Sequence, residues 1–161
     1  MPRSQEKETK QNGLVPAELL IPQGRRMRLI EWVRKPTQNS LQAETTVTEE
    51  WPLRRDRAVS SLICVELVAQ AISALSTLRR GDGAGPRIGL LVGIKEAEFP
   101  NLYVPVKTRL FIQVEELYHV GNYAAFQGTV RSESDSFCRI VIQAMEPEEE
   151  VLSDLRILPK P

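Results

Sequence analysis

The sequence predicts an α+β fold in which a curved antiparallel sheet wraps around one long central helix. Residues 58–79 are apolar or small at nearly every position and contain neither glycine nor proline, which is typical of a helix surrounded by protein. Stretches rich in β-forming residues stand on both sides of this segment. Because a buried helix must be covered by other elements, we expect these strands to form the sheet around it.

The chain before the helix contains a short helical segment and two strands. Residues 17–24 (AELLIPQG) follow Pro16 and end in a proline and a glycine, which predicts one or two helical turns. Residues 27–33 (MRLIEWV) and 40–47 (SLQAETTV) are rich in β-forming residues, and the turn-like sequence KPTQN separates them. They are therefore expected to form a pair of strands.

The long helix has recognisable end signals. Ser60 and Ser61 are candidate N-caps, because a serine hydroxyl can accept a hydrogen bond from the first turn. Arg79 and Arg80 followed by Gly81 are typical of a helix C-terminus. The helix therefore spans roughly residues 58–79.

Four strands are expected after the helix, separated by turn signals. Their sequences are RIGLLVGIKEAEF (87–99), KTRLFIQVEELYHV (107–120), YAAFQGTVRSE (123–133) and DSFCRIVIQAME (135–146). The turn sequences at 121–122 and 132–135 predict that the strands they join pair in antiparallel fashion.

The chain of 161 residues fits one domain. We expect a disordered polar tail at 1–13, a folded domain at 14–147 and an acidic, amphipathic tail at 148–161.

The composition excludes several classes of function. The 21 Lys and Arg residues balance the 21 Asp and Glu residues, so no global positive charge favours nucleic acid or an anionic membrane. The N-terminal residues lack the apolar stretch of a signal peptide, which places the protein in the cytoplasm as an expectation. Cys64 and Cys138 lack the paired spacing of a zinc or redox motif, so we expect buried thiols, no metal and no other cofactor.

The helix carries one acid, Glu66, followed by Ala69 and Gln70. The stretch VSSLICVELVAQAISALS resembles the central helix of the β-hydroxyacyl-acyl carrier protein dehydratases of the FabA and FabZ type, in which a glutamate or aspartate precedes an Ala-Gln pair. The sequence is most similar to the ApeP-like dehydratases of aryl polyene clusters, because LIPQGRRMRLIEWV takes the place of their Leu-Pro-His-x-x-x-Met segment. The resemblance covers roughly residues 19–147 and implies the hotdog fold.

The resemblance also identifies residues that differ from the family pattern. Dehydratases pair the helix acid with a histidine, but TEEWPLRRDRAVSS replaces the Gly-His-Phe region, and Gln23 replaces the histidine of the Leu-Pro-His segment. The chain's single histidine, His119, is interpreted as a strand-end or turn residue. Ser60-Ser61 replaces a Pro-Gly before the helix, and Lys107 replaces a glycine.

The expected site follows from these matches. Glu66 is the candidate catalytic acid or base, with a structural acid at a dimer seam as the alternative. Gln23, Ser61, Leu62 and Gln70 are the candidate substrate-binding residues. Gln70 lies one helical turn beyond Glu66, so it either faces the same pocket or satisfies a buried carboxyl group.

Basic residues offer a candidate carrier-binding surface. Arg25 and Arg26, together with Arg54 and Arg55, could hold the phosphate of a pantetheine carrier or the acidic face of an acyl carrier protein. The alternative is an ordinary solvated surface.

Three functions remain open. The first is an acyl-thioester-binding relative of the dehydratases that is weakly active or is a non-catalytic partner subunit. The second is an acyl-ACP or acyl-CoA thioesterase that uses Glu66 alone. The third is a structural or regulatory acyl-binding protein. The resemblance implies a homodimer, or a heterodimer with another hotdog subunit, and an acyl carrier protein or coenzyme A thioester as the partner.

Overall fold

The computed structural model describes residues 13–34, 36–81, 83, 85, 87 and 89–154. Seven antiparallel strands form the main sheet in the order β1-β2-β3-β8-β9-β10-β6. Their bounds are β1 Leu14–Pro16, β2 Trp32–Arg34, β3 Ser40–Thr46, β8 Arg109–Val120, β9 Tyr123–Arg131, β10 Ser136–Met145 and β6 Leu90–Glu98. A second sheet contains β4 Arg54–Arg55, β5 Ala58–Ser60 and β7 Tyr103–Pro105. The helices are the 3-10 turn η1 Ala17–Leu19, α2 Ile63–Arg79 and α3 Glu149–Asp154.

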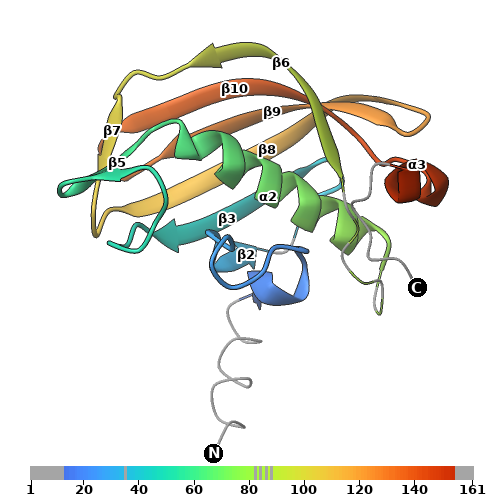
Figure 1. The fold of residues 1–161 in the computed structure, drawn as a ribbon, viewed down its shortest axis with the longest axis horizontal. Helices are drawn as coiled ribbons and strands as arrows, with labels where there is room; N and C mark the ends of the chain where they lie inside the picture. Colours follow the sequence, from blue (N-terminus) through green and yellow to red (C-terminus); the bar gives the residue numbers. More distant parts are fainter. Residues whose placement is uncertain are drawn as a thin grey trace, which may run out of the picture.

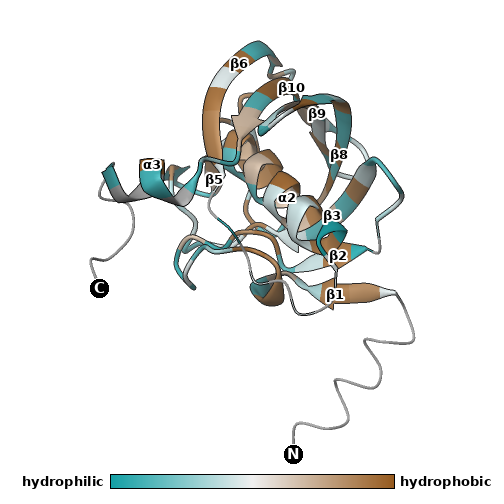
Figure 2. Cartoon of the chain, turned by 90° about the vertical axis from the view of Figure 1, so that its right-hand side faces the viewer, coloured by the Kyte–Doolittle hydropathy of each residue, from teal (hydrophilic) through white to brown (hydrophobic). Residues whose placement is uncertain are grey.

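The main sheet curves around α2, so the predicted architecture is confirmed. Figure 1 shows α2 lying across β3, β8, β9 and β10, and Figure 2 shows the sheet bending around the helix. Most of the helix is buried, including Leu67, Ala71 and Leu75, each with 0% of its surface exposed. A glycine allows the close approach of helix and sheet, because a Cβ on Gly128 of β9 would lie 2.4 Å from a methyl group of Val68.

The hairpin predictions after the helix are confirmed. β8 pairs with β9, and β9 pairs with β10, both antiparallel. β6 pairs with the other side of β10 and forms one edge of the sheet. Before the helix, β2 and β3 pair as expected.

The predicted start of the helix is wrong. Residues 58–60 form β5, which pairs with β4 on one side and β7 on the other. The helix begins at Ile63 with Leu62 as its N-cap, and no side chain caps it. Ser60 contributes only a long bond, in which the Leu62 N–H donates to its hydroxyl at 3.4 Å.

The strand expected at 27–33 is also shorter than predicted. Only Trp32–Arg34 forms β2, and residues 27–30 follow an irregular path. Their backbone groups bond to the Gln70 side chain of α2, as described below, and also to the Gly24 carbonyl and the Thr45 hydroxyl of β3. The first expected helical segment is present as η1.

Lys107 adopts a backbone conformation that suits the glycine expected at its position from the resemblance. Its φ of 71° lies in the left-handed region, where a residue with a Cβ is strained. The Lys107 N–H nevertheless donates to the Val47 carbonyl at 2.8 Å, which fixes this turn.

The two thiols are buried and free, as predicted. A hydrogen bond with Cys138 and burial together raise the pKa of Cys64, which makes this thiol a poor nucleophile. Among the described residues no cluster of metal-ligating side chains occurs, and none of the described helices is long and apolar enough to cross a membrane. Most of the two expected tails lies outside the described residues, although α3 falls within the C-terminal one.

Candidate functional site

A cavity of about 560 Å³ is lined by residues of α2 and of the main sheet. It begins beside Glu66 and Gln23 and extends along the helix to Arg79 and Arg80. The size falls within the range of cavities that bind small ligands. Two of the predicted site residues, Glu66 and Gln23, therefore face a common space.

The Glu66 carboxylate accepts hydrogen bonds from two carboxamides. Gln70 Nε2 donates to Glu66 Oε1 at 2.8 Å, and Gln23 Nε2 donates to the same oxygen at 3.3 Å. Neither amide engages the second carboxylate oxygen, Oε2. Gln23 thus lies beside the helix acid, at the motif position where the resemblance leads us to expect a histidine.

Gln70 connects Glu66 to the irregular segment 27–30. Its Oε1 accepts the N–H groups of Leu29 and Ile30 at 2.9 and 3.3 Å, while its Nε2 donates to the Met27 carbonyl at 2.5 Å. These backbone partners fix which end of the amide is the donor, so Gln70 must donate to Glu66. Gln70 is completely buried and does not line the cavity, whereas Glu66 is half-buried and lines it, so a substrate-binding role for Gln70 stays a prediction.

Ser61 and Leu62 do not line this cavity. The Ser61 hydroxyl donates to the Asn101 carbonyl at 2.5 Å, and its N–H donates to the Leu102 carbonyl at 2.8 Å. Both groups therefore anchor the loop between β6 and β7. Leu62 is 60% exposed at the start of the helix. Their substrate-binding role stays a prediction.

The four candidate carrier-binding arginines are exposed and lie outside the cavity lining. Arg54 and Arg55 form β4, and Arg54 donates to the Asp56 carbonyl at 3.2 Å. Arg25 and Arg26 belong to the turn that follows Gln23. Their role in carrier binding also stays a prediction.

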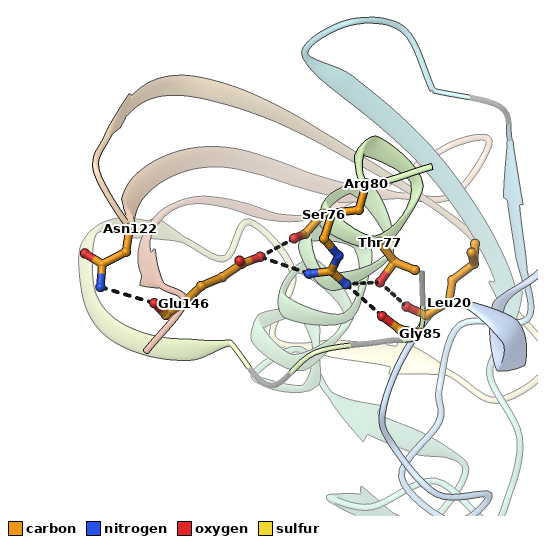
Figure 3. A network of polar contacts seen from close by, with 7 residues as sticks. All are labelled: Leu20, Ser76, Thr77, Arg80, Gly85, Asn122 and Glu146. Carbon is orange, nitrogen blue, oxygen red and sulfur yellow. Dashed lines mark hydrogen bonds and ion pairs between the residues drawn. The ribbon is translucent and has the colours of Figure 1, made fainter. Parts of the chain in front are cut away.

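The far end of the cavity contains a polar network that the sequence interpretation missed. Figure 3 shows Arg80 donating to Glu146 at 3.4 Å, to the Thr77 hydroxyl at 3.3 Å and to the Gly85 carbonyl at 2.9 Å. Ser76 also donates to the Glu146 carboxylate. Helical spacing is a signal that could have found this network, because Glu66, Ser73, Ser76 and Arg80 follow one face of an otherwise apolar helix.

His119 belongs to this far end and not to the surroundings of Glu66. One ring nitrogen lies 2.6 Å from the Gly121 carbonyl, and the other lies 3.6 Å from Glu116, which pairs with Arg79. Thirteen residues of helix separate Glu66 from Arg79, or about 20 Å at 1.5 Å per residue. The interpretation of His119 as a strand-end residue therefore fits its position near the end of β8.

Comparison with known proteins identifies the family. The model of the ApeP-like family, described as ApeP dehydratase, matches residues 15–155. No curated protein matches the chain significantly.

Solved structures share the fold. A chain of the dehydratase heterocomplex ApeI:P from Xenorhabdus doucetiae is 21% identical, with a TM-score of 0.74 over 88% of this chain and 97% of that chain. A sigma28-regulated virulence protein from Campylobacter jejuni is 10% identical, with a TM-score of 0.62 over 81% of this chain and 93% of that one. A hypothetical thioesterase from Streptococcus pneumoniae, solved with coenzyme A, is 13% identical, with a TM-score of 0.56 over 71% and 84%. At these identities the likeness concerns the fold alone, and it agrees with the predicted hotdog fold.

Proposed function

This chain belongs to the ApeP-like dehydratase family, and from that membership we propose that it binds 3-hydroxyacyl thioesters with an incomplete acid–base pair. Such a protein works as a weak dehydratase or as the non-catalytic partner of an active hotdog subunit. One observation carries the proposal: among the described residues, the only side chains bonded to the Glu66 carboxylate are the carboxamides of Gln23 and Gln70.

Dehydration of a 3-hydroxyacyl thioester needs two titrating groups. A base removes the proton from C2, and an acid protonates the hydroxyl group that leaves C3. Glu66 can perform one of these steps. Gln23 can orient a hydroxyl or carbonyl group through its amide, but an amide does not exchange a proton as an acid does. Loss of the second titrating group is expected to lower the rate of dehydration by a factor of roughly 10²–10⁴.

A second hotdog subunit is the proposed protein partner. β6 is an edge strand, and among the described residues no strand pairs with its outer side. Two of its apolar side chains that do not line the cavity, Val92 and Ile94, are each 46% exposed. An unpaired apolar edge favours extension of the sheet into another subunit. The heterocomplex of the similar dehydratase supports this assignment.

The partner assignment can be tested by measuring molar mass in solution. We expect the purified chain to dimerise at micromolar concentration and Val92→Lys to weaken the dimer. Val120→Lys, at a valine 70% exposed near the end of β8, is the matched control and should leave the dimer intact. A wild-type chain that stays monomeric would contradict the homodimer and leave a heterodimer as the only form of the proposal.

The activity is tested with 3-hydroxyacyl and saturated acyl thioesters of pantetheine, coenzyme A and acyl carrier protein. We expect wild-type protein to bind the 3-hydroxyacyl thioester and form enoyl product slowly, and Glu66→Gln to abolish product formation. Glu133→Gln, at an exposed turn, is the control for a lost carboxylate. Enoyl formation that survives in Glu66→Gln would refute the role of Glu66.

A gain-of-function variant tests the missing acid–base group directly. Gln23→His places an imidazole beside Glu66, and we expect enoyl formation to rise by at least roughly tenfold because a titrating partner is restored. Carrier binding is tested separately with Arg25→Ala and Arg54→Ala, which should weaken binding of the acyl carrier protein more than binding of a pantetheine thioester.

Thioester hydrolysis is the second candidate function. Both carboxamides bond to the same carboxylate oxygen, so Oε2 is engaged by neither and could activate a water molecule. Release of free thiol from saturated acyl thioesters, lost in Glu66→Gln, would favour this function over dehydration. Binding without either product would favour a structural or regulatory acyl-binding protein.

A further inference from the structure

The cavity changes character along its length. Beyond Glu66 its walls are apolar, and they come from one helix face and from β9 and β10: Ala69, Ile72, Ala124, Phe126, Ile142 and Ala144. Such walls suit the hydrocarbon part of an acyl chain. Fourteen residues separate Glu66 from Arg80, so the backbone of Arg80 lies about 21 Å farther along the helix axis than that of Glu66, at 1.5 Å per residue.

The far end is charged, and the charge is predominantly positive. Arg79, Arg80 and Arg87 line it together with Glu116 and Glu146. Arg79 pairs with Glu116 and Arg80 pairs with Glu146, whereas Arg87 has no acidic partner within 4 Å among the described residues. These lining side chains therefore carry one positive charge in excess.

Hydrogen-bonding capacity at this end is not fully used. The Arg80 Nε at this end and the Ser73 hydroxyl, halfway along the helix between Glu66 and Arg80, are buried without a hydrogen-bond partner in the described part of the chain, and both side chains line the cavity. Buried polar atoms are normally paired, because an unpaired one loses its hydration without compensation. The methyl end of a simple fatty acyl chain offers no partner to these groups.

We propose that the far end of the cavity binds an oxygen acceptor, above all a carboxylate, at the distal end of the acyl chain. The ligand is then a thioester whose chain carries a polar group at both ends. This assignment rests on the proposed function, since it takes Glu66 to mark the thioester end. A distal carboxylate would accept charge-assisted hydrogen bonds from the Arg80 guanidinium, which belongs to the network drawn in Figure 3. A distal methyl group would displace water from these charged side chains without offering them a hydrogen bond.

The test compares acyl chains that differ only at their distal atom. Non-hydrolysable pantetheine thioether analogues, from octanoyl to hexadecanoyl, are prepared with a methyl, hydroxyl or carboxylate end, and their Kd values are measured by calorimetry. We expect the carboxylate form to bind roughly tenfold tighter than the methyl form at the best chain length, with the hydroxyl form between them.

Two variants with opposite charge changes separate recognition from structural damage. Arg87→Gln removes an exposed positive charge and should weaken carboxylate binding roughly fivefold. Glu146→Gln keeps an oxygen that can accept from Ser76 and Arg80 but removes a negative charge, so it should strengthen carboxylate binding by a similar factor. Neither should change binding of the methyl form.

Each outcome decides the proposal. Equal or tighter binding of the methyl form overturns it while the proposed function stands. If both variants strengthen or both weaken carboxylate binding, the proposal is also overturned. The same holds if a variant changes the Kd of the methyl form as much as that of the carboxylate form. Either result would indicate altered packing. If no analogue of any kind binds, the proposed function fails and this assignment fails with it.

Discussion

Replacing Gln70 by leucine is expected to destabilise the fold far more than the similar volumes of the two side chains suggest. Gln70 is completely buried and makes four hydrogen bonds, three of them to the backbone of residues 27–30 and one to Glu66. Leucine fills a similar volume but bonds to none of these groups. The segment that follows Gln23 would lose its three hydrogen bonds to Gln70 of α2, and the bonds of Gln23 to Glu66 and of Leu20 to Thr77 would remain.

The magnitude follows from the groups left without a partner. Leu29 and Ile30 are 3% and 1% exposed, so their N–H groups cannot turn to water without local unfolding. Each orphaned group costs about 1–3 kcal/mol, which predicts a loss of about 2–6 kcal/mol in the free energy of unfolding. The Met27 carbonyl adds little to this sum, because Met27 is 47% exposed and can be hydrated.

Denaturation by urea, followed by circular dichroism, measures this loss. Gln113→Leu on the exposed side of β8 is the matched control, and it should change stability by less than about 0.5 kcal/mol. A loss below about 1 kcal/mol for Gln70→Leu, with an unchanged m value, would refute the reasoning that Gln70 holds the segment in place.

Three further variants test other features by the same measurement. Lys107→Gly should stabilise the protein by about 0.5–1 kcal/mol, because removal of the backbone strain at a φ of 71° gains more than the extra conformational entropy of the unfolded chain costs. A lower stability of the variant would show that the lysine side chain contributes more than this strain costs. Gly128→Ala should cost about 1–3 kcal/mol, and adding Val68→Ala should recover part of that loss, so strictly additive losses would contradict the packing argument. Burial and the nearby Glu44 carboxylate raise the pKa of Glu31 above 4.5, so the stability that Glu31 contributes is present in acid and is lost as the pH rises through its folded pKa. Glu31→Gln should therefore gain stability over wild type at neutral pH but not below pH 4.5, and an equal difference at both would count against it.

The strand order after the helix could be predicted because its signals are local. Turn sequences at 121–122 and 132–135 set the pairing of β8, β9 and β10 without reference to the rest of the chain. The start of the helix could not be predicted in this way. Residues 58–60 have no glycine or proline to exclude a helix, and they form a strand because β7, about 45 residues later, pairs with them.

The site was predictable to a similar extent. The resemblance placed Gln23 and Glu66 in one expected site, because each residue occupies a motif position, but it did not predict the hydrogen bond between them. The irregular path of residues 27–30 was not anticipated, since their sequence favours a strand, whereas bonds with the Gln70 side chain, the Gly24 carbonyl and the Thr45 hydroxyl hold them otherwise. The network at Arg80 depends on Glu146 and Gly85, which no motif connects to the helix.

The β8-β9-β10 meander also has a consequence for how the chain folds. Its strands are joined by short turns, so they can pair after closing only small loops. β3 must instead find β8 across about seventy residues of chain, a non-local step that slows folding. We therefore expect the meander to be structured in the transition state and β3 to dock afterwards. Substitutions in β9 should then slow folding, whereas those in β3 should mainly accelerate unfolding.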